Sequence, residues 1–129
     1  MKEVLVIEDN GENLRLITYV LKKAGYGVIP AQTGESGVEL ALRQNPSFII
    51  IDINLPDIDG FAVTDRIRSS ERGRQIPIIA ITSHAMRGDR ERILAAGCSA
   101  YFEKPIDPLT IMDRIHEIIE RNPTTSNGR

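Results

Sequence analysis

The sequence predicts an α/β fold in which helices cover both faces of a five-stranded, doubly wound parallel sheet. Three apolar, largely β-branched runs at residues 4–7, 48–51 and 78–81 are continuous, as is typical of strands that are buried on both faces. Stretches with the apolar spacing of helices separate these runs. Because strand and helix alternate five times, the pattern indicates parallel crossover units and favours the strand order 2-1-3-4-5.

Local signals support the first half of this pattern, and a weaker strand is expected at residues 27–29. The first helix ends at Gly25, in the position that a C-terminal glycine prefers. Thr33 is expected to cap the second helix, which ends before Pro46. The apolar faces of these two helices consist of Leu14, Ile17, Leu21 and Ala24, and of Val38, Ala41 and Leu42.

The second half continues with a third helix at about residues 61–70 and a fourth at about residues 86–96, followed by a weak strand at residues 99–102. Asp107 and Pro108 are expected to be the cap and first position of the last helix. Its apolar face consists of Leu109, Met112, Ile115 and Ile119. Residues 122–129 are polar and without pattern, so we expect one domain at residues 1–121 and a flexible tail at residues 122–129.

The composition argues against several classes of protein. With 129 residues, 41% hydrophobic and 26% charged, the chain is typical of a single globular domain. A net charge of −2, without a basic surplus, argues against a nucleic-acid partner. No apolar run is long enough for a bilayer span, and the N-terminus does not resemble a secretory signal. Cys98 is the only cysteine, and we expect a small buried hydrophobe in a reducing, cytoplasmic protein.

Polar residues follow the predicted strands at their carboxyl ends. Glu8 and Asp9 follow the first strand, Asp52 the third and Thr82 the fourth, while Lys104 lies just beyond the fifth. In a parallel sheet these ends share one edge, and the crevice at that edge is the usual ligand site. With the order 2-1-3-4-5 the first and third strands are neighbours, so the three carboxylates should converge.

Three converging carboxylates require a counter-charge. At an effective dielectric near 20, each pair at ~4 Å repels by roughly 4 kcal/mol, which favours proton uptake or a bound cation. Oxygen ligands with open positions suit Mg²⁺, and the absence of histidine or cysteine beside the acids argues against zinc. With Lys104 and the Thr82 hydroxyl, these groups predict a phosphoryl-transfer site at Asp52. A single glycine after the first strand, Gly11, disfavours a nucleotide phosphate cradle.

The chain from about residue 2 to residue 121 resembles the receiver domains of response regulators, which have a flavodoxin-like fold. The residues that carry this resemblance are Glu8-Asp9, Asp52-Ile53-Asn54-Leu55-Pro56-Asp57-Ile58-Asp59-Gly60, Thr82-Ser83, Tyr101 and Lys104-Pro105. They occur in order and at compatible spacing. Residues 86–105 are similar to stand-alone regulators of bacterial cell division and development, and also to receiver modules within hybrid kinases.

The resemblance implies that a histidine kinase or a histidine phosphotransfer protein phosphorylates Asp52. It implies Mg²⁺ ligands on Asp9 and Asp52, on the backbone carbonyl of Asn54, and on Glu8 through water. Lys104 and Thr82 would contact the phosphoryl oxygens, Thr82 and Tyr101 would act as switch residues, and Asn54 and His84 would modulate the lifetime of the phosphorylated form. The output would be a downstream protein target that contacts the fourth helix around Met86, Arg87 and Arg90. The protein would then be a non-enzymatic signalling domain and a monomer or weak dimer.

Two other functions remain open at this point. A phosphohydrolase of the haloacid dehalogenase type also uses an aspartyl phosphate and Mg²⁺, but its nucleophile follows the first strand and a second aspartate stands two residues on. Here Asp52 follows the third strand, and Asn54 occupies that second position. A phosphorylation-independent interaction module is the other alternative. His116 is expected to be a helix-surface residue and not a phosphotransfer histidine.

Overall fold

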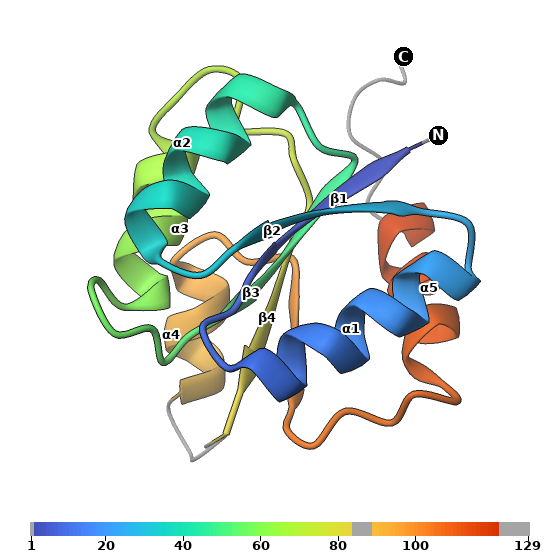
Figure 1. Cartoon of the computed structure of the whole chain (residues 1–129). Coiled ribbons are helices and arrows are strands. Elements are labelled where there is room, and N and C mark those ends of the chain that lie inside the picture. The colour runs from blue at the N-terminus through green and yellow to red at the C-terminus, as the bar shows by residue number, and fades with distance from the viewer. Residues whose placement is uncertain (1, 84–88, 122–129) are drawn as a thin grey trace.

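The computed structural model describes residues 2–83 and 89–121, which form one parallel sheet between two layers of helices (Figure 1). The sheet order is β2-β1-β3-β4-β5, and every strand pair is parallel. The predicted fold class and strand order are therefore confirmed. The elements are β1 Glu3–Ile7, α1 Gly11–Lys23, β2 Gly27–Ala31, α2 Gly34–Gln44, β3 Phe48–Asp52, α3 Gly60–Arg68, β4 Ile78–Thr82, α4 Asp89–Ala95, β5 Ala100–Glu103 and α5 Ile111–Arg121.

The central strands are buried on both faces because helices cover each side of the sheet. In Figure 1, α1 and α5 lie on one side, and α2, α3 and α4 lie on the other. Along β1, Val4 and Val6 pack into the cluster formed with α1 and α5, whereas Leu5 and Ile7 pack into the opposite cluster. This alternation explains why the strand runs are continuous in the sequence.

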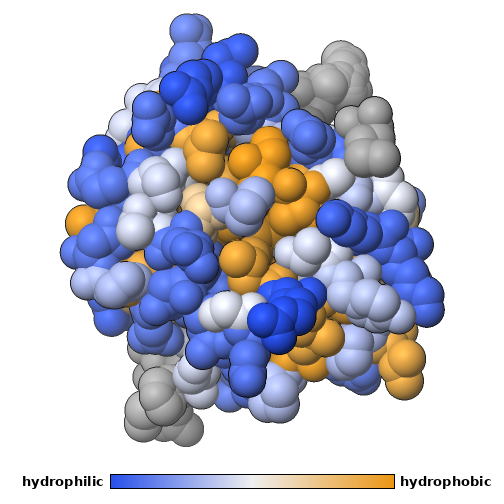
Figure 2. Space-filling model, viewed as in Figure 1, coloured by the Kyte–Doolittle hydropathy of each residue, from blue (hydrophilic) through white to orange (hydrophobic). Residues whose placement is uncertain are grey.

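The strand β2 lies at one edge of the sheet and is only half covered. Figure 2 shows hydrophobic residues along the middle of the face where β2 lies in Figure 1, with hydrophilic residues on either side. Val28 and Ile29 of this strand are half-buried, and Pro30 is exposed. Because proline has no N–H, Pro30 removes one donor with which another strand could pair.

Side-chain caps and a left-handed glycine set the helix boundaries, and of these the Thr33 cap and Gly25 were predicted. The Asn10 side chain accepts a hydrogen bond from the N–H of Asn13 at 2.9 Å and starts α1. The Thr33 hydroxyl accepts from the N–H of Ser36 at 3.1 Å and starts α2. Gly25 follows α1 with a φ of +95°, a conformation that side chains other than glycine rarely adopt.

The predicted start of the last helix at Pro108 is wrong, because α5 begins at Ile111. The Asp107 carboxylate accepts a hydrogen bond from the N–H of Leu109 at 3.0 Å, and the Asp107 carbonyl accepts from the N–H groups of Thr110 and Ile111. These bonds form a turn that delays the helix. Leu109 is therefore 88% exposed, and its predicted place on the apolar face is also wrong.

Smaller differences concern other boundaries. The strand β2 extends to Ala31, beyond the predicted residue 29, and α3 begins with Asp59 as its cap and ends at Arg68, two residues before its predicted end. The predicted place of Ala24 on the apolar face of the first helix is wrong, because α1 ends at Lys23 and Ala24 is its exposed C-cap. The first residues of the predicted fourth helix, 86–88, lie outside the described part of the chain, as does the predicted tail at residues 122–129.

Among the described residues, no helix combines the length and apolar character that a membrane span requires.

Candidate functional site

Three carboxylates meet at the carboxyl edge of the sheet, as predicted. Glu8 and Asp9 follow β1, Asp52 is the last residue of β3, and Ile7 pairs with Ile51 in the register of these neighbouring strands. One carboxylate oxygen of each acid lies within 4.8 Å of those of the other two. Residues 43 positions apart in the sequence therefore share one small site, because parallel neighbours end at the same edge.

Lys104 supplies the positive charge on the opposite flank of this site. Its Nζ lies 3.1 Å from Asp52 Oδ2 and 3.4 Å from Glu8 Oε1. The backbone fixes this position because the N–H of Lys104 donates to the carbonyl of Thr82 at 2.8 Å, which continues the β4–β5 pairing. The bond between Lys104 and Pro105 is cis.

Glu8 is the most deeply buried member of the acidic group, with 1% of its surface exposed. Burial and the adjacent Asp52 carboxylate raise the pKa of Glu8 from 4.5 to about 7, against the opposing effects of the Asn10 N–H and the Lys104 ammonium. Oε2 accepts a hydrogen bond from the N–H of Asn10 at 3.2 Å. Within the described part of the chain, Oε1 is buried and accepts no hydrogen bond.

This arrangement fits a hard divalent cation. Asp9 is exposed beside the buried Glu8 and Asp52, so the site is open to solvent on the Asp9 side. The formal charge of three carboxylates exceeds that of Lys104 by two negative charges, and Glu8 Oε1, which accepts no hydrogen bond, has capacity for a ligand or its water. Few carboxylates and open positions are what Mg²⁺ prefers in proteins.

The loop after β3 contributes backbone groups to the same place. The N–H of Asn54 donates to Asp52 Oδ1 at 2.9 Å, while Lys104 holds Oδ2. Both oxygens of Asp52 are thus oriented, and the carboxylate is 3% exposed. Asn54 itself is exposed at the edge of the site. Because a cation contacts one oxygen and an N–H contacts the other, the orientation of the Asp52 carboxylate is fixed.

Comparison with known proteins identifies the family. The family model described as the response regulator receiver domain matches residues 4–116. The chain belongs to the response regulator receiver family. The receiver is 41% identical, over 105 residues, to the polar-differentiation response regulator DivK of Brucella ovis, which corresponds to 81% of this chain and 85% of that protein. The resemblance to regulators of this type is thereby confirmed.

Solved structures agree with this assignment. The receiver domain of the sensor histidine kinase PA1611 from Pseudomonas aeruginosa PAO1 has a TM-score of 0.85 and 38% identity, covering 92% of this chain and 98% of that chain. That crystal structure contains a magnesium ion coordinated in its active site cleft. The chemotaxis response regulator CheY4 of Vibrio cholerae, at 24% identity and a TM-score of 0.86 over 92% and 98% of the two chains, has the same fold.

The two predicted switch residues lie on β4, which pairs with the strand of Asp52, and on β5, one strand further away. Thr82 is the last residue of β4 and is 3% exposed, and Ile81 before it pairs with Asp52. Tyr101 lies on β5, pairs with Ala80 and is half-buried against the core cluster of α2, α3 and α4. Thr82 thus lies at the carboxyl edge of the receiver, whereas Tyr101 lies two register positions further back on the adjacent strand.

Other predicted residues have different outcomes. His84, Met86 and Arg87 lie outside the described residues, while Arg90 on α4 is exposed. His116 is half-buried on α5, where its Nε2 lies 2.9 Å from the hydroxyl of Tyr26. No local pattern predicts this partner, which lies 90 positions away.

Cys98 is buried near Thr64, as expected for a small hydrophobe, and burial raises the pKa of its thiol. The thiol is therefore poorly suited to ionise and react.

Asp57, an exposed residue in the loop between β3 and α3, belongs to the matched motif but had no predicted role. Its carboxylate accepts hydrogen bonds from the N–H groups of Gly34 and Glu35, and these bonds lower the pKa of Asp57. A local pattern cannot reveal these contacts because the partners lie 22 and 23 positions away. The only sequence signal was an acid three residues after Asn54 in a matched motif.

A cavity of about 440 Å³ lies at the opposite edge of the sheet, around the residues that precede β1, β3 and β4. Its lining includes two cations, Lys2 and Arg72, and no carboxylate. It is distinct from the acidic site of the receiver, and it has none of the groups from which the phosphoryl chemistry was predicted.

Proposed function

We propose that this receiver is a single-domain response regulator that accepts a phosphoryl group on Asp52. The donor would be the phosphohistidine of a histidine kinase or of a histidine phosphotransfer protein, in the cytoplasm. The observation that carries the proposal is the environment of Asp52, a buried carboxylate with Lys104 Nζ at 3.1 Å and two further acids whose oxygens lie within 4.8 Å. A nucleophile, a cation and a divalent-ion site around one carboxylate are the parts that phosphoryl transfer requires.

In the proposed reaction an Asp52 oxygen attacks the phosphorus, the new O–P bond forms, and the P–N bond to the donor imidazole breaks. The electron pair of that bond returns to the imidazole nitrogen, which takes up a proton from solvent. The Asn54 N–H and Lys104 Nζ orient the Asp52 carboxylate before attack. Lys104 and the Thr82 hydroxyl would then contact the phosphoryl oxygens, which carry the charge that develops during transfer.

A magnesium ion would be held by Asp9, Asp52 and the Asn54 carbonyl, with Glu8 acting through water. When bound, the ion would neutralise the negative charge that accumulates between the acids and the phosphoryl group. The magnesium in the active site of the related PA1611 receiver supports this part of the proposal. The buried Oε1 of Glu8, which accepts no hydrogen bond and has the Lys104 ammonium at 3.4 Å, is a second observation that supports it.

The output would be a change in the face formed by β4, α4 and β5. A phosphoryl group at Asp52 would draw the Thr82 hydroxyl toward it, and Tyr101 would turn into the vacated space. A downstream protein would then bind near α4, where Arg90 is exposed. Asn54 and His84 would set the lifetime of the phosphorylated form, so the domain would catalyse only its own phosphorylation and dephosphorylation.

Phosphorylation by a small donor tests the assignment of Asp52. Incubation with Mg²⁺ and acetyl phosphate should add one phosphoryl group to the wild type, as measured by intact mass, and none to Asp52→Asn. Asp65→Asn, on the exposed surface of α3, is the matched control and should be labelled like the wild type. Label on Asp52→Asn, or fast multiple turnover of p-nitrophenyl phosphate by the wild type, would contradict the proposal.

A further inference from the structure

The loop between β3 and α3, residues 53–59, packs into the core through Ile53, Leu55 and Ile58, and its polar residues project from it. Asn54, Pro56, Asp57 and Asp59 are exposed. Backbone bonds fix only its ends, since the N–H of Ile53 donates to β4 at 3.0 Å and the N–H at the start of α3 donates back to the Ile53 carbonyl at 2.8 Å. The N–H of Asn54 donates to Asp52 Oδ1 at 2.9 Å, and whatever holds the middle of the loop adds to this bond in setting the Asn54 carbonyl.

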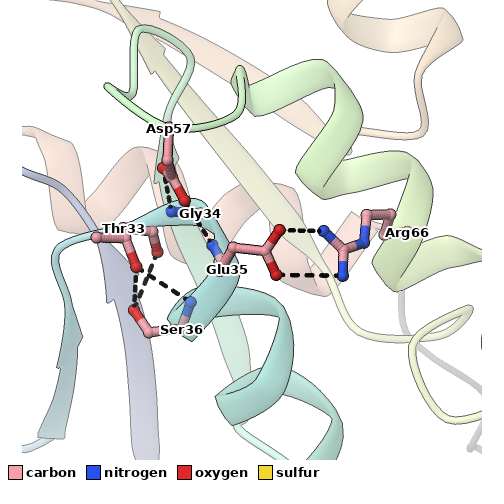
Figure 3. Close-up of polar contacts among 6 residues, drawn as sticks. All are labelled: Thr33, Gly34, Glu35, Ser36, Asp57 and Arg66. Carbon is pink, nitrogen blue, oxygen red and sulfur yellow. Dashed lines mark hydrogen bonds and ion pairs between the residues drawn. The ribbon is translucent and has the colours of Figure 1, made fainter.

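Asp57 holds that middle against the first turn of α2, as Figure 3 shows. Oδ1 accepts from the N–H of Gly34 at 2.8 Å, and Oδ2 accepts from the N–H of Glu35 at 3.0 Å. Thr33 already caps the next free donor of this turn, the N–H of Ser36. The helix N-terminus is thus satisfied by one residue of its own sequence and by one residue of a distant loop.

Apolar packing reinforces this contact. Gly34 faces Ile58, and a Cβ placed on Gly34 would overlap the Ile58 side chain and crowd Val63 of α3. The absence of a side chain at Gly34 therefore lets the loop approach the α2 backbone closely enough for both hydrogen bonds of Asp57. Among the described residues, Asp57 is the only member of the loop whose side chain hydrogen-bonds beyond the loop and α3.

The segment that precedes α2 is hydrogen-bonded to the acidic site. The N–H of Glu8 donates to the carbonyl of Ala31 at 2.8 Å, and α2 begins three residues after Ala31. Asp57 therefore joins two segments that the site needs in register. One segment carries Asn54, and the other is hydrogen-bonded to Glu8 at the end of β1.

We infer that Asp57 is a positioning residue for the metal site, which sets the Asn54 carbonyl against the carboxylates of Glu8 and Asp9. The inference rests on the proposed role of Asn54 and the acids as Mg²⁺ ligands. Asp57 does not touch the ligand atoms and acts through the loop and the α2 N-terminus. Residues that orient ligands in this way affect metal affinity by about 10- to 100-fold in other proteins.

The test compares Asp57→Ala with Thr33→Ala, since both remove caps from the same helix end but only Asp57 holds the loop. Titration calorimetry with Mg²⁺ should give a Kd about tenfold weaker for Asp57→Ala than for the wild type, and an unchanged Kd for Thr33→Ala. The initial rate of phosphorylation by acetyl phosphate should require correspondingly more Mg²⁺ in Asp57→Ala but recover at saturating Mg²⁺.

Either of two results would overturn the inference: an unchanged Mg²⁺ Kd in Asp57→Ala, or an equal loss of affinity in Thr33→Ala, which would point to helix stability alone. If Asp57→Ala does not fold, Asp57→Asn decides, since it keeps one of the two acceptors and should weaken Mg²⁺ by about threefold. Failure of the proposed function is separately visible. A wild type that binds Mg²⁺ but is never labelled at Asp52 would contradict phosphoryl transfer and leave the Kd comparison intact.

Discussion

At the scale of single residues, Glu8 shows that burying a carboxylate in the acidic site lowers the stability of the fold. The carboxyl group is buried beside Asp52, so its ionised form is disfavoured, and the pKa rises to about 7. Lys104 opposes this effect from 3.4 Å but does not cancel it. A group of this kind binds protons more tightly in the folded state than in the unfolded state, so it destabilises the fold when the pH is high.

The first prediction concerns the pH dependence of stability without Mg²⁺. Below about pH 4.5 Glu8 is protonated in both states and has no effect. As the pH rises from 4.5 to about 7, only the unfolded state loses its proton, so the free energy of unfolding should fall by up to about 3 kcal/mol, at ~1.4 kcal/mol per pKa unit, and then level off.

Urea unfolding across this pH range measures the effect, as the difference between the wild type and Glu8→Gln. Glu12→Gln, an exposed position at the start of α1, is the control and should retain the wild-type pH profile. A Glu8→Gln profile parallel to that of the wild type would show that Glu8 has an ordinary pKa.

At the scale of elements, Arg68 of α3 connects two segments outside the sheet, the α3–β4 connection and the residues after α4. Its guanidinium donates to the carbonyls of Gly73 and Ile76 in the connection to β4, and to the carbonyl of Gly97 after α4, at 2.5 to 2.9 Å. Gly97 has a φ of +112°, and a Cβ there would crowd the Arg68 side chain. One side chain thus satisfies three carbonyls at the end of α4 and before β4.

We expect Arg68→Ala to reduce the free energy of unfolding by about 3 kcal/mol, because several partly buried carbonyls lose a charged donor at once. Arg68→Lys should recover only part of this loss, since an ammonium group cannot reproduce the planar fork. The control lies on the same helix. Arg66 pairs with Glu35 of α2 at 3.0 Å, but both side chains are about half exposed or more (Figure 3), so Arg66→Ala should cost less than about 1 kcal/mol. Equal losses for Arg66→Ala and Arg68→Ala in urea unfolding would contradict this view.

The elements also show which parts of the structure the sequence could predict. The buried strands were predictable because residues 48–51 and 78–81 are apolar without interruption, and Thr33 capped its helix because that bond spans only three residues. The start of α5 was not predictable, since Asp107 followed by Pro108 suits a helix cap and a turn equally well. Long-range contacts such as that of Asp57 depend on how the loops pack, and the local sequence does not encode this packing.

At the scale of the whole molecule, the receiver gathers its acids at one edge of the sheet, and the site could be predicted because parallel strands end together. The same geometry creates repulsion that the rest of the fold must offset. Carboxylates at ~4 Å repel by roughly 4 kcal/mol per pair at a dielectric near 20, and one lysine faces three acids. The unliganded receiver should therefore be less stable than its core alone would allow.

The stability of the whole domain should accordingly depend on Mg²⁺. A ligand that binds only the folded state stabilises it by RT ln(1 + [L]/Kd), so Mg²⁺ at ten times its Kd should add about 1.4 kcal/mol and raise Tm by roughly 5 °C. Asp9→Asn removes one charge from the exposed side of the site, so without Mg²⁺ its Tm should equal or exceed that of the wild type. The same variant should lose most of the Mg²⁺-dependent rise, whereas Glu12→Gln should keep it. Thermal unfolding with and without Mg²⁺ measures both effects. If Asp9→Asn is less stable than the wild type without Mg²⁺, then Asp9 stabilises the unliganded receiver, and the predicted repulsion between the acids is contradicted.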